Sequence, residues 1–79
     1  MEIRFYAGAA DAAGTATTTL TGEQLTAGGL LDRLGEQNQA LAVVLARCTL
    51  LVNGSAVRDP DEPIPGSARV DVLPPFAGG

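Results

Sequence analysis

The final stretch, residues 69–79, constrains the fold more than any other part of the sequence. Val70 and Val72 alternate with charged residues, which is the period-two pattern of a strand with one face against a core. Pro74 and Pro75 follow directly. Because proline lacks a backbone N–H and has a fixed φ, strand pairing has to stop there and the chain has to continue in an extended form. The sequence therefore predicts a buried last strand that feeds a short tail.

The tail ends in Phe76, Ala77, Gly78 and Gly79. The segment 74–79, at roughly 3.1–3.5 Å per residue, would carry the final carboxylate on the order of 20 Å from the sheet. Glycine has no Cβ, so the last two residues can lie in a channel too narrow for any other residue. The Gly79 carboxylate is therefore the candidate reactive group, and an incidental Gly-Gly ending is the alternative interpretation.

Composition indicates one small globular domain. The chain has 79 residues and a hydrophobic fraction of 46%, which is ordinary for a folded domain with a modest core. It contains no run of about 18 apolar residues and no charged leader before an apolar segment, so neither a membrane span nor a secretory signal is expected. Cys48 is the single cysteine, which excludes an internal disulfide. We therefore expect a cytoplasmic protein without a membrane partner.

The charged residues make nucleic acid an unexpected partner. All five basic residues are arginines, scattered through the chain against nine carboxylates, which gives a formal net charge of −4. A protein that binds nucleic acid needs a basic patch to neutralise phosphates. The acidic balance suits a basic partner surface, and ordinary solubility explains it equally well.

The first third of the chain predicts a hairpin. In residues 2–7, Ile3, Phe5 and Ala7 share one face, as in a half-buried strand. Residues 8–14 are small and read as a loop or a single turn. The threonine-rich segment 15–20 predicts a second strand, paired with the first at a sheet edge.

The middle of the chain predicts helical cover for the sheet. Thr26 is a candidate N-cap for a helix that carries Leu30, Leu31 and Leu34 and ends near Gly35. Gly28 and Gly29 indicate either close helix–sheet packing or simple tolerance of glycine. The apolar segment 40–46 is a short helix or a continuation of the core cover.

A second hairpin precedes the last strand. Residues 49–52 are apolar on both faces, as in a central strand, and Asn53-Gly54 favours a type I′ turn into a short return strand over 56–58. The segment 59–66 holds three prolines and three carboxylates and reads as a surface loop.

Few side chains in this sequence support catalysis. Cys48 has neither histidine nor lysine to act as its base, so a small buried hydrophobe is the preferred interpretation. With no histidine and one cysteine, zinc and most transition metals are not expected. Asp59, Asp61 and Glu62 could hold a weak hard cation, but a solvated acidic loop is favoured. The chain is not expected to be an enzyme by itself or to bind a cofactor.

Taken together, these segments resemble the ubiquitin-like sulfur-carrier family. The resemblance rests on segments 3–7 and 13–14, on 51–54, on 63–66, and above all on the ending Val70-Asp71-Val72-Leu73-Pro74-Pro75-Phe76-Ala77-Gly78-Gly79. It implies an α+β β-grasp fold, with a mixed sheet of about five strands, one main helix on one face, and the first and last strands parallel and adjacent. The domain would span residues 1–73, and residues 74–79 would form a flexible, extended reactive tail.

The family comprises the small subunit of molybdopterin synthase and the sulfur carrier of thiamine biosynthesis. The first-strand pattern, which ends in Tyr6 and Ala7, and the Pro74-Pro75 pair favour the molybdopterin branch. The proline-rich segment 59–65 departs from the family pattern, which concerns local loop contacts and not the tail.

The resemblance also implies a mechanism and partners. An adenylyltransferase similar to ubiquitin-activating enzymes would use ATP to adenylate Gly79, and a sulfur-transfer protein would supply the sulfur of a thiocarboxylate. A synthase large subunit would receive the tail, with Phe76 either anchoring the interface or folding back on its own sheet. Delivery of sulfur to thiazole or cysteine, ubiquitin-like protein modification, and an inert interaction module remain alternatives.

Overall fold

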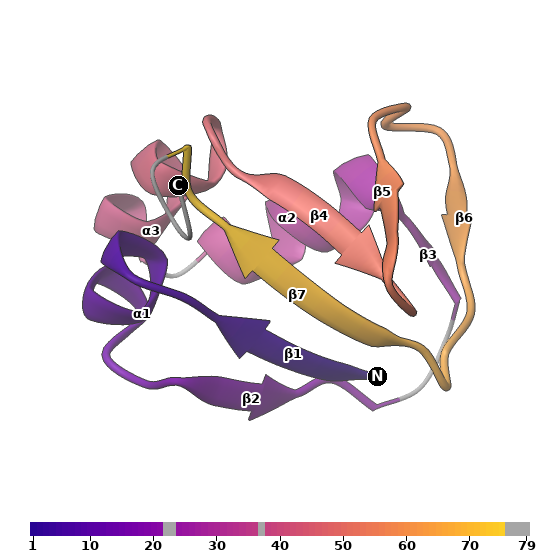
Figure 1. Cartoon of the computed structure of the whole chain (residues 1–79), viewed down its shortest axis with the longest axis horizontal. Coiled ribbons are helices and arrows are strands. Elements are labelled where there is room, and N and C mark those ends of the chain that lie inside the picture. The colour runs from indigo at the N-terminus through magenta and orange to yellow at the C-terminus, as the bar shows by residue number, and fades with distance from the viewer. Residues whose placement is uncertain (22–23, 37, 76–79) are drawn as a thin grey trace.

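The computed structural model describes residues 1–21, 24–36 and 38–75. Its main feature is a five-stranded mixed sheet in the order β2-β1-β7-β4-β5 (Figure 1). The strands of this sheet are β1 (Glu2–Phe5), β2 (Thr17–Thr19), β4 (Thr49–Val52), β5 (Ser55–Val57) and β7 (Arg69–Leu73). The helices are α1 (Gly8–Ala13), α2 (Ala27–Gly35) and α3 (Gln39–Leu45). A separate antiparallel pair joins β3 (Leu25–Thr26) to β6 (Pro63–Ile64).

The predicted last strand is the centre of the sheet. β7 runs parallel to β1, with Val70 beside Ile3, and antiparallel to β4, with Val72 opposite Leu50. Val70 and Val72 are fully buried. The alternation of valine with charged residues has therefore placed one face of β7 in the core, and the predicted parallel contact between the first and last strands is confirmed.

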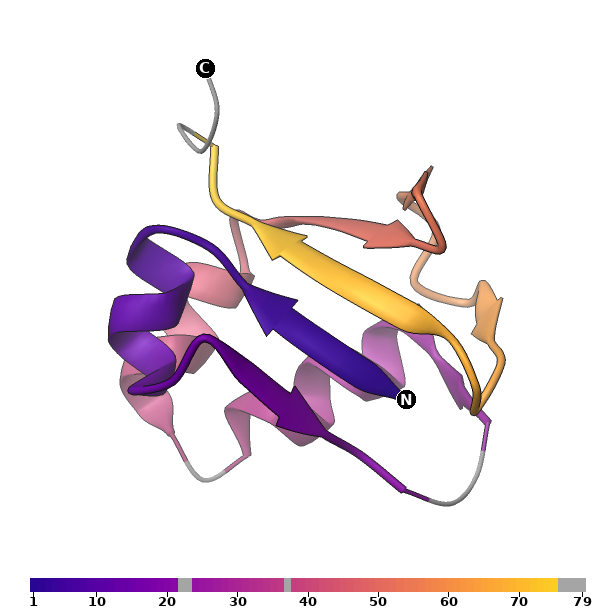
Figure 2. The same cartoon turned by 60° about the horizontal axis from the view of Figure 1, so that its bottom comes forward.

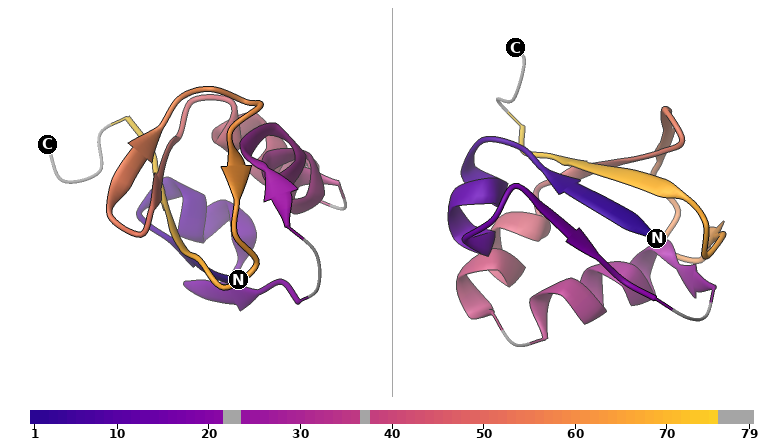
Figure 3. Two further views of the ribbon diagram at one scale, coloured as in Figure 1. Left: turned by 90° about the vertical axis from the view of Figure 1, so that its right-hand side faces the viewer. Right: turned by 90° about the horizontal axis from the view of Figure 1, so that it is seen from below.

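All three helices of the described part lie on one face of the sheet (Figures 2 and 3). Leu30 of α2 and Leu41 and Leu45 of α3 enter the same core cluster as the inward side chains of the central strands. Fully burying an aliphatic side chain of this size contributes roughly 1.5–3 kcal/mol. No helix within the described ranges lies over the opposite face of the sheet, where Arg4 and Tyr6 are exposed.

The segment after β1 differs from the prediction. Residues 8–14 were expected to form a loop or single turn, and instead Gly8–Ala13 form α1. Ala7, expected within the first strand, precedes this helix with φ 50° and ψ −128°, so it turns the chain out of β1. The segment is rich in alanine, the best helix former, and Gly14 ends the helix in the left-handed region at φ 77°.

The segment 59–66 is also more ordered than the predicted surface loop. β6 lies within it and pairs with β3, and Ile64 is fully buried. Two of its carbonyls accept hydrogen bonds from the start of α2, because the N–H groups of Ala27 and Gly28 donate to the oxygens of Glu62 (2.8 Å) and Pro60 (2.8 Å). Gly28, for which the sequence left close helix–sheet packing and simple tolerance open, is in close contact with this segment, since a Cβ there would lie 3.2 Å from Pro60.

Local signals elsewhere are confirmed. The hydroxyl of Thr26 accepts a hydrogen bond of 3.0 Å from the N–H of Gly29, as an N-cap should. Asn53 and Gly54 both have positive φ, at 50° and 88°, as a type I′ turn requires. β2 is an edge strand, and the return strand is shifted by one residue from the predicted 56–58.

We expect Gly35→Ala to destabilise the fold. A Cβ at Gly35 would lie 2.9 Å from the Cβ of Ala42, so the end of α2 and the facing part of α3 would have to separate. Overpacking of this kind typically costs about 1–3 kcal/mol. Gly8→Ala is the matched control, because a Cβ there meets nothing within 4 Å, and it should stabilise by about 0.4–1 kcal/mol. Urea unfolding of both variants measures the difference, and equal effects would contradict the close contact.

Candidate functional site

The root of the tail is held by the two central strand pairings. β7 ends at Leu73, which lies opposite Thr49 of β4. On the other side, the N–H of Tyr6 donates to the carbonyl of Val72 at 3.2 Å. Pairing with β4 therefore extends to Leu73, the hydrogen bond on the β1 side holds Val72, and the chain leaves the sheet at that end (Figure 2).

The structure describes only the first two of the predicted tail residues. Pro74 is half-buried and Pro75 is exposed, so the prolines stand where the strand pairing stops, as predicted. Phe76, Ala77, Gly78 and Gly79 lie outside the described residues. The reactive carboxylate, the narrow-channel role of the glycines, the anchoring role of Phe76, and the division into a domain 1–73 and a tail 74–79 therefore stay predictions.

Beside the root, the uncovered face of the sheet carries a polar pair that the sequence analysis missed. The hydroxyl of Tyr6 donates to Oδ1 of Asp71 at 3.3 Å, and the Tyr6 side chain keeps 37% of its surface exposed. Asp71 lies between Arg4 and Leu51 in the register of the sheet. The signal available in the sequence was the outward position of Tyr6 relative to Ile3 and Phe5.

Cys48 lies close to the same end of the sheet, because it directly precedes Thr49, the register partner of Leu73. Its thiol is half-buried and donates to the carbonyl of Val44 at 3.3 Å. Burial raises the pKa of the Cys48 thiol above its ordinary value. A higher pKa leaves less thiolate at neutral pH, so the environment makes this sulfur a poor nucleophile. The predicted buried hydrophobe is thus correct in character, although part of the side chain remains accessible.

The acidic loop has a structural use. Oδ1 of Asp59 accepts a hydrogen bond of 2.9 Å from the N–H of Asp61, which stabilises the local turn. Across the described ranges, no three His, Cys, Asp or Glu side chains come together as metal ligands. A hard-cation site at Asp59, Asp61 and Glu62 gains no support from this geometry.

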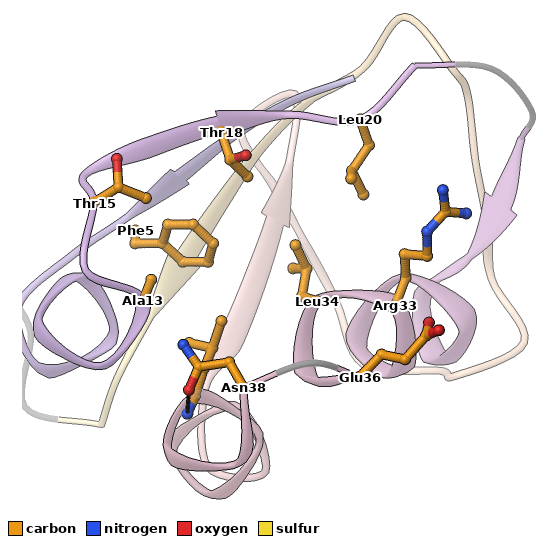
Figure 4. Close-up of a pocket in the computed structure, with 10 residues that line it drawn as sticks. Phe5, Ala13, Thr15, Thr18, Leu20, Arg33, Leu34, Glu36 and Asn38 are labelled. Carbon is orange, nitrogen blue, oxygen red and sulfur yellow. Dashed lines mark hydrogen bonds between the residues drawn. The ribbon is translucent and has the colours of Figure 1, made fainter.

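A cavity of about 320 Å³ opens on the helix side of the sheet, between the end of β2, α2 and the start of α3 (Figure 4). Leu20 and Leu34 point toward one another across it, and Arg33 and Glu36 stand together at one rim. The Asn38 amide is used structurally, because it donates to the carbonyl of Ala12 at 2.9 Å and accepts from the N–H of Leu41 at 3.0 Å.

This cavity does not define a ligand by itself. Its charged rim residues are exposed and of opposite sign, and its floor consists of core side chains. The tail root at the end of β7 is not among its lining residues. The predicted site and the cavity are therefore separate features of the molecule.

Nowhere in the described ranges is a helix both long enough and apolar enough to span a membrane.

Comparison with known proteins supports the fold and the family. The sequence model of the ThiS family matches residues 3–79. No curated protein matches the chain by sequence. The crystal structure of SAMP1 from Haloferax volcanii aligns with a TM-score of 0.79 at 27% identity, covering 100% of this chain and 98% of that chain.

Two further solved structures share the fold. The solution structure of small archaeal modifier protein 1 from Methanosarcina acetivorans has a TM-score of 0.79 at 24% identity, covering 99% of this chain and 94% of that one. A putative molybdopterin converting factor, subunit 1, from Pyrococcus furiosus has a TM-score of 0.80 at 19% identity and covers 95% of each chain. These neighbours confirm the ubiquitin-like β-grasp fold predicted from the sequence.

We expect Cys48 to react slowly with a thiol reagent such as an aromatic disulfide. The hydrogen bond to Val44 and the raised pKa both favour the protonated thiol, so the native protein should react on the order of tenfold slower than the chain in urea. The native rate should still be rising at a pH where an ordinary thiol has already ionised. Absorbance of the released reagent measures both rates, and identical native and unfolded rates would contradict the assignment.

Proposed function

The chain belongs to the ThiS family of ubiquitin-like sulfur-carrier proteins, and on this premise we propose that it carries sulfur as a thiocarboxylate on Gly79. The observation that carries the proposal is that the family match runs from residue 3 through Gly79, so it includes the tail as well as the domain. The structure adds that β7, which leads to this tail, is the central strand of the five-stranded sheet.

The chemistry requires activation of a carboxylate that is a poor electrophile. In the proposed first step, an activating enzyme joins the Gly79 carboxylate to the α-phosphate of ATP and releases pyrophosphate. The terminal sulfur of a persulfide on a sulfur-transfer protein then attacks the acyl carbon, a C–S bond forms, and AMP leaves with the electron pair of the broken C–O bond. A thiol cleaves the resulting acyl disulfide, which leaves the thiocarboxylate and a new disulfide.

This chain supplies the reactive end and a handle, and its partners supply the catalytic groups. The proposed partners are an adenylyltransferase related to ubiquitin-activating enzymes and the sulfur-transfer protein, with ATP bound by the adenylyltransferase and no cofactor bound by this chain. All of these steps would take place in the cytoplasm. The domain then serves as the surface by which each partner holds the tail in its active site.

The prolines suit such a tail. Pro74 and Pro75 restrict the unbound chain, so less conformational entropy is lost when a partner orders the residues that follow. Gly78 and Gly79 would enter the narrow part of the partner's channel, and Ala77 would lie at its mouth. Phe76 would dock at the rim of the channel as an apolar anchor.

Within this chemistry we favour molybdopterin synthesis, with the chain as the small subunit of the synthase. The support comes from the first-strand pattern and the Pro74-Pro75 pair. A large subunit that binds the pterin precursor would receive the tail. Each thiocarboxylate delivers one sulfur and a dithiolene needs two, so the spent carrier would have to leave and be replaced. Thiazole or cysteine synthesis is the alternative destination of the sulfur.

Protein modification is a second candidate function, because SAMP1 from Haloferax volcanii is a modifier protein and shares 27% identity with this chain. In that case the Gly79 carboxyl would form an amide with an amine of a target protein. The two functions share the activation step and differ in the nucleophile that receives the acyl group.

We predict that addition of two serines after Gly79 abolishes activation without affecting the fold. The added residues would replace the terminal glycine carboxylate that the activating enzyme has to reach, while the core is closed by β7 upstream. ATP–pyrophosphate exchange with the activating enzyme measures the first step, and thermal unfolding serves as the control. Undiminished exchange with the extended chain would refute Gly79 as the reactive residue.

The destination of the sulfur can be tested with the thiocarboxylated chain, pterin precursor and candidate large subunits. We expect about one dithiolene for every two carriers consumed, because each carrier delivers a single sulfur atom. Thiazole formation without any dithiolene would reject the molybdopterin branch and retain the sulfur carrier. Amide conjugates of target proteins, with sulfur transfer to neither product, would favour the modifier function.

A further inference from the structure

An activated carboxyl group is open to attack by any nucleophile within its reach. In an acyl-adenylate of Gly79, an attacking amine nitrogen forms a C–N bond with the acyl carbon, the C–O bond to AMP breaks, and the nitrogen releases a proton. A thiolate attacks in the same way and gives a thioester. A protein that carries such a group on its own end therefore competes with its own lysines, α-amine and cysteines for the acyl group.

The positive side chains of this protein cannot compete for the acyl group. Every basic residue is arginine, and the chain has no lysine, although lysine is among the commonest residues in proteins. All five arginines are exposed, and an exposed lysine would serve solubility equally well. The guanidinium stays protonated in proteins, so it has no free electron pair for acyl transfer.

One of these arginines lies near the root of the tail, where a lysine amine could attack the activated carbonyl of Gly79. Arg47 precedes β4 by two residues, and the first residue of β4, Thr49, lies opposite Leu73 at the root of the tail (Figure 1). A tail of six residues spans on the order of 20 Å, which makes the turn between α3 and β4 accessible to its end. Arg69, in contrast, begins β7 and lies at the opposite end of the strand.

The other two nucleophiles are held by hydrogen bonds. The thiol of Cys48, which lies in the same turn as Arg47, donates to the Val44 carbonyl, and its raised pKa lowers the thiolate fraction. The nitrogen of Met1 donates to the carbonyl of Leu20 at 2.8 Å and is partly buried. Met1 adjoins Glu2, whose neighbour in β7 is Arg69, so this amine lies at the end of the sheet away from the tail root.

We propose that this chain is built to carry an activated end without intercepting it, so that Gly79 passes its acyl group or its sulfur only to a different protein. This inference rests on the proposed function, because it presupposes that Gly79 becomes activated. It names the acceptor: the persulfide or amine that attacks Gly79 belongs to a partner. If the chain modifies proteins, it adds as a single unit, since an attached copy offers no lysine to the next one.

The test uses the 79-residue chain prepared chemically with Gly79 as a small alkyl thioester, which reproduces the activated carbonyl without an enzyme. Incubation at about pH 8, where α-amines are substantially deprotonated, allows hydrolysis and self-linkage to compete. Intact mass separates the two reactions. Hydrolysis gives the free acid, and self-acylation within one chain gives a product that is lighter than the free acid by one water. We expect the unchanged chain to give the free acid.

Arg47→Lys is the decisive variant, and Arg69→Lys is its matched control with the same chemical change at the far end of β7. Arg47→Lys should self-link at least about tenfold faster than the unchanged chain, at a rate independent of protein concentration, because the amine and the thioester belong to one molecule. Arg69→Lys should give mainly linked pairs of chains, at a rate that rises with protein concentration. Thermal unfolding should be the same for all three proteins.

Comparable self-linkage by the unchanged chain and by Arg47→Lys would overturn the proposal, since arginine would then give no protection. Self-linkage of Arg47→Lys at the rate of Arg69→Lys, with the same concentration dependence, would overturn the placement of the vulnerable site beside the tail root. Two glycines added before Met1 should release its amine from Leu20 and increase linked pairs, and no increase would overturn the protection assigned to that contact. These outcomes are independent of enzymatic activation, so they are distinguishable from a failure of ATP–pyrophosphate exchange.

Discussion

The parallel pairing of β1 with β7 is the interaction on which the rest of this structure depends. It places Glu2 beside Arg69 and Phe5 beside Val72. Nearly the whole chain therefore lies between the two paired strands in sequence. Closing a loop of this length costs conformational entropy. Burial of apolar surface on both strands offsets that cost, because Ile3, Val70 and Val72 are fully buried under the helices. Everything between the two strands serves either to cover that face or to extend the sheet.

This arrangement also determines where a reactive end can stand. A tail attached to an edge strand or a frayed terminus would move with the element that carries it. Here the tail follows the central strand of the sheet, whose last residue is held from one side by β4 and whose penultimate carbonyl is held from the other by Tyr6. The folded domain thus fixes the point from which the proposed reactive tail starts. The same strand, β7, therefore both stabilises the sheet and positions the start of the tail.

The sequence predicted the parts of the fold in which periodicity and local chemistry agree. The valine alternation in β7, the Asn53-Gly54 turn and the Thr26 cap each depend on neighbouring residues, and each was recognised. α1 was missed because Gly8 and Gly14 suggested a turn, while the alanines between them supplied helix propensity and a short apolar side, with Ala9 buried. β6 was missed because the prolines and carboxylates around Ile64 hid a single buried side chain that no periodicity could reveal.

The candidate site was predicted differently. The strand, the prolines and the Gly79 carboxylate as candidate reactive group followed from the residues alone, and the adenylation and thiocarboxylate chemistry came from the family resemblance. The contact of Tyr6 with Asp71 joins residues 65 positions apart, so no local pattern contains it. The cavity bounded by Leu20 and Leu34 depends likewise on how α2 sits beneath the hairpin. Register and packing across distant segments decide such features, and they become visible only in three dimensions.

The distribution of polar groups explains why such a domain would need partners for chemistry. Among the described residues, the core contains no buried polar or charged side chain, so it offers neither a desolvated acid nor a base with a useful pKa. Enzymes obtain much of their power from preorganised polar groups in sites that exclude water. A core made only of aliphatic, aromatic and alanine side chains can supply rigidity and nothing more. Under the proposed function, recognition would lie in the exposed face of the sheet and the tail, and the chemical step in the partner protein that receives them.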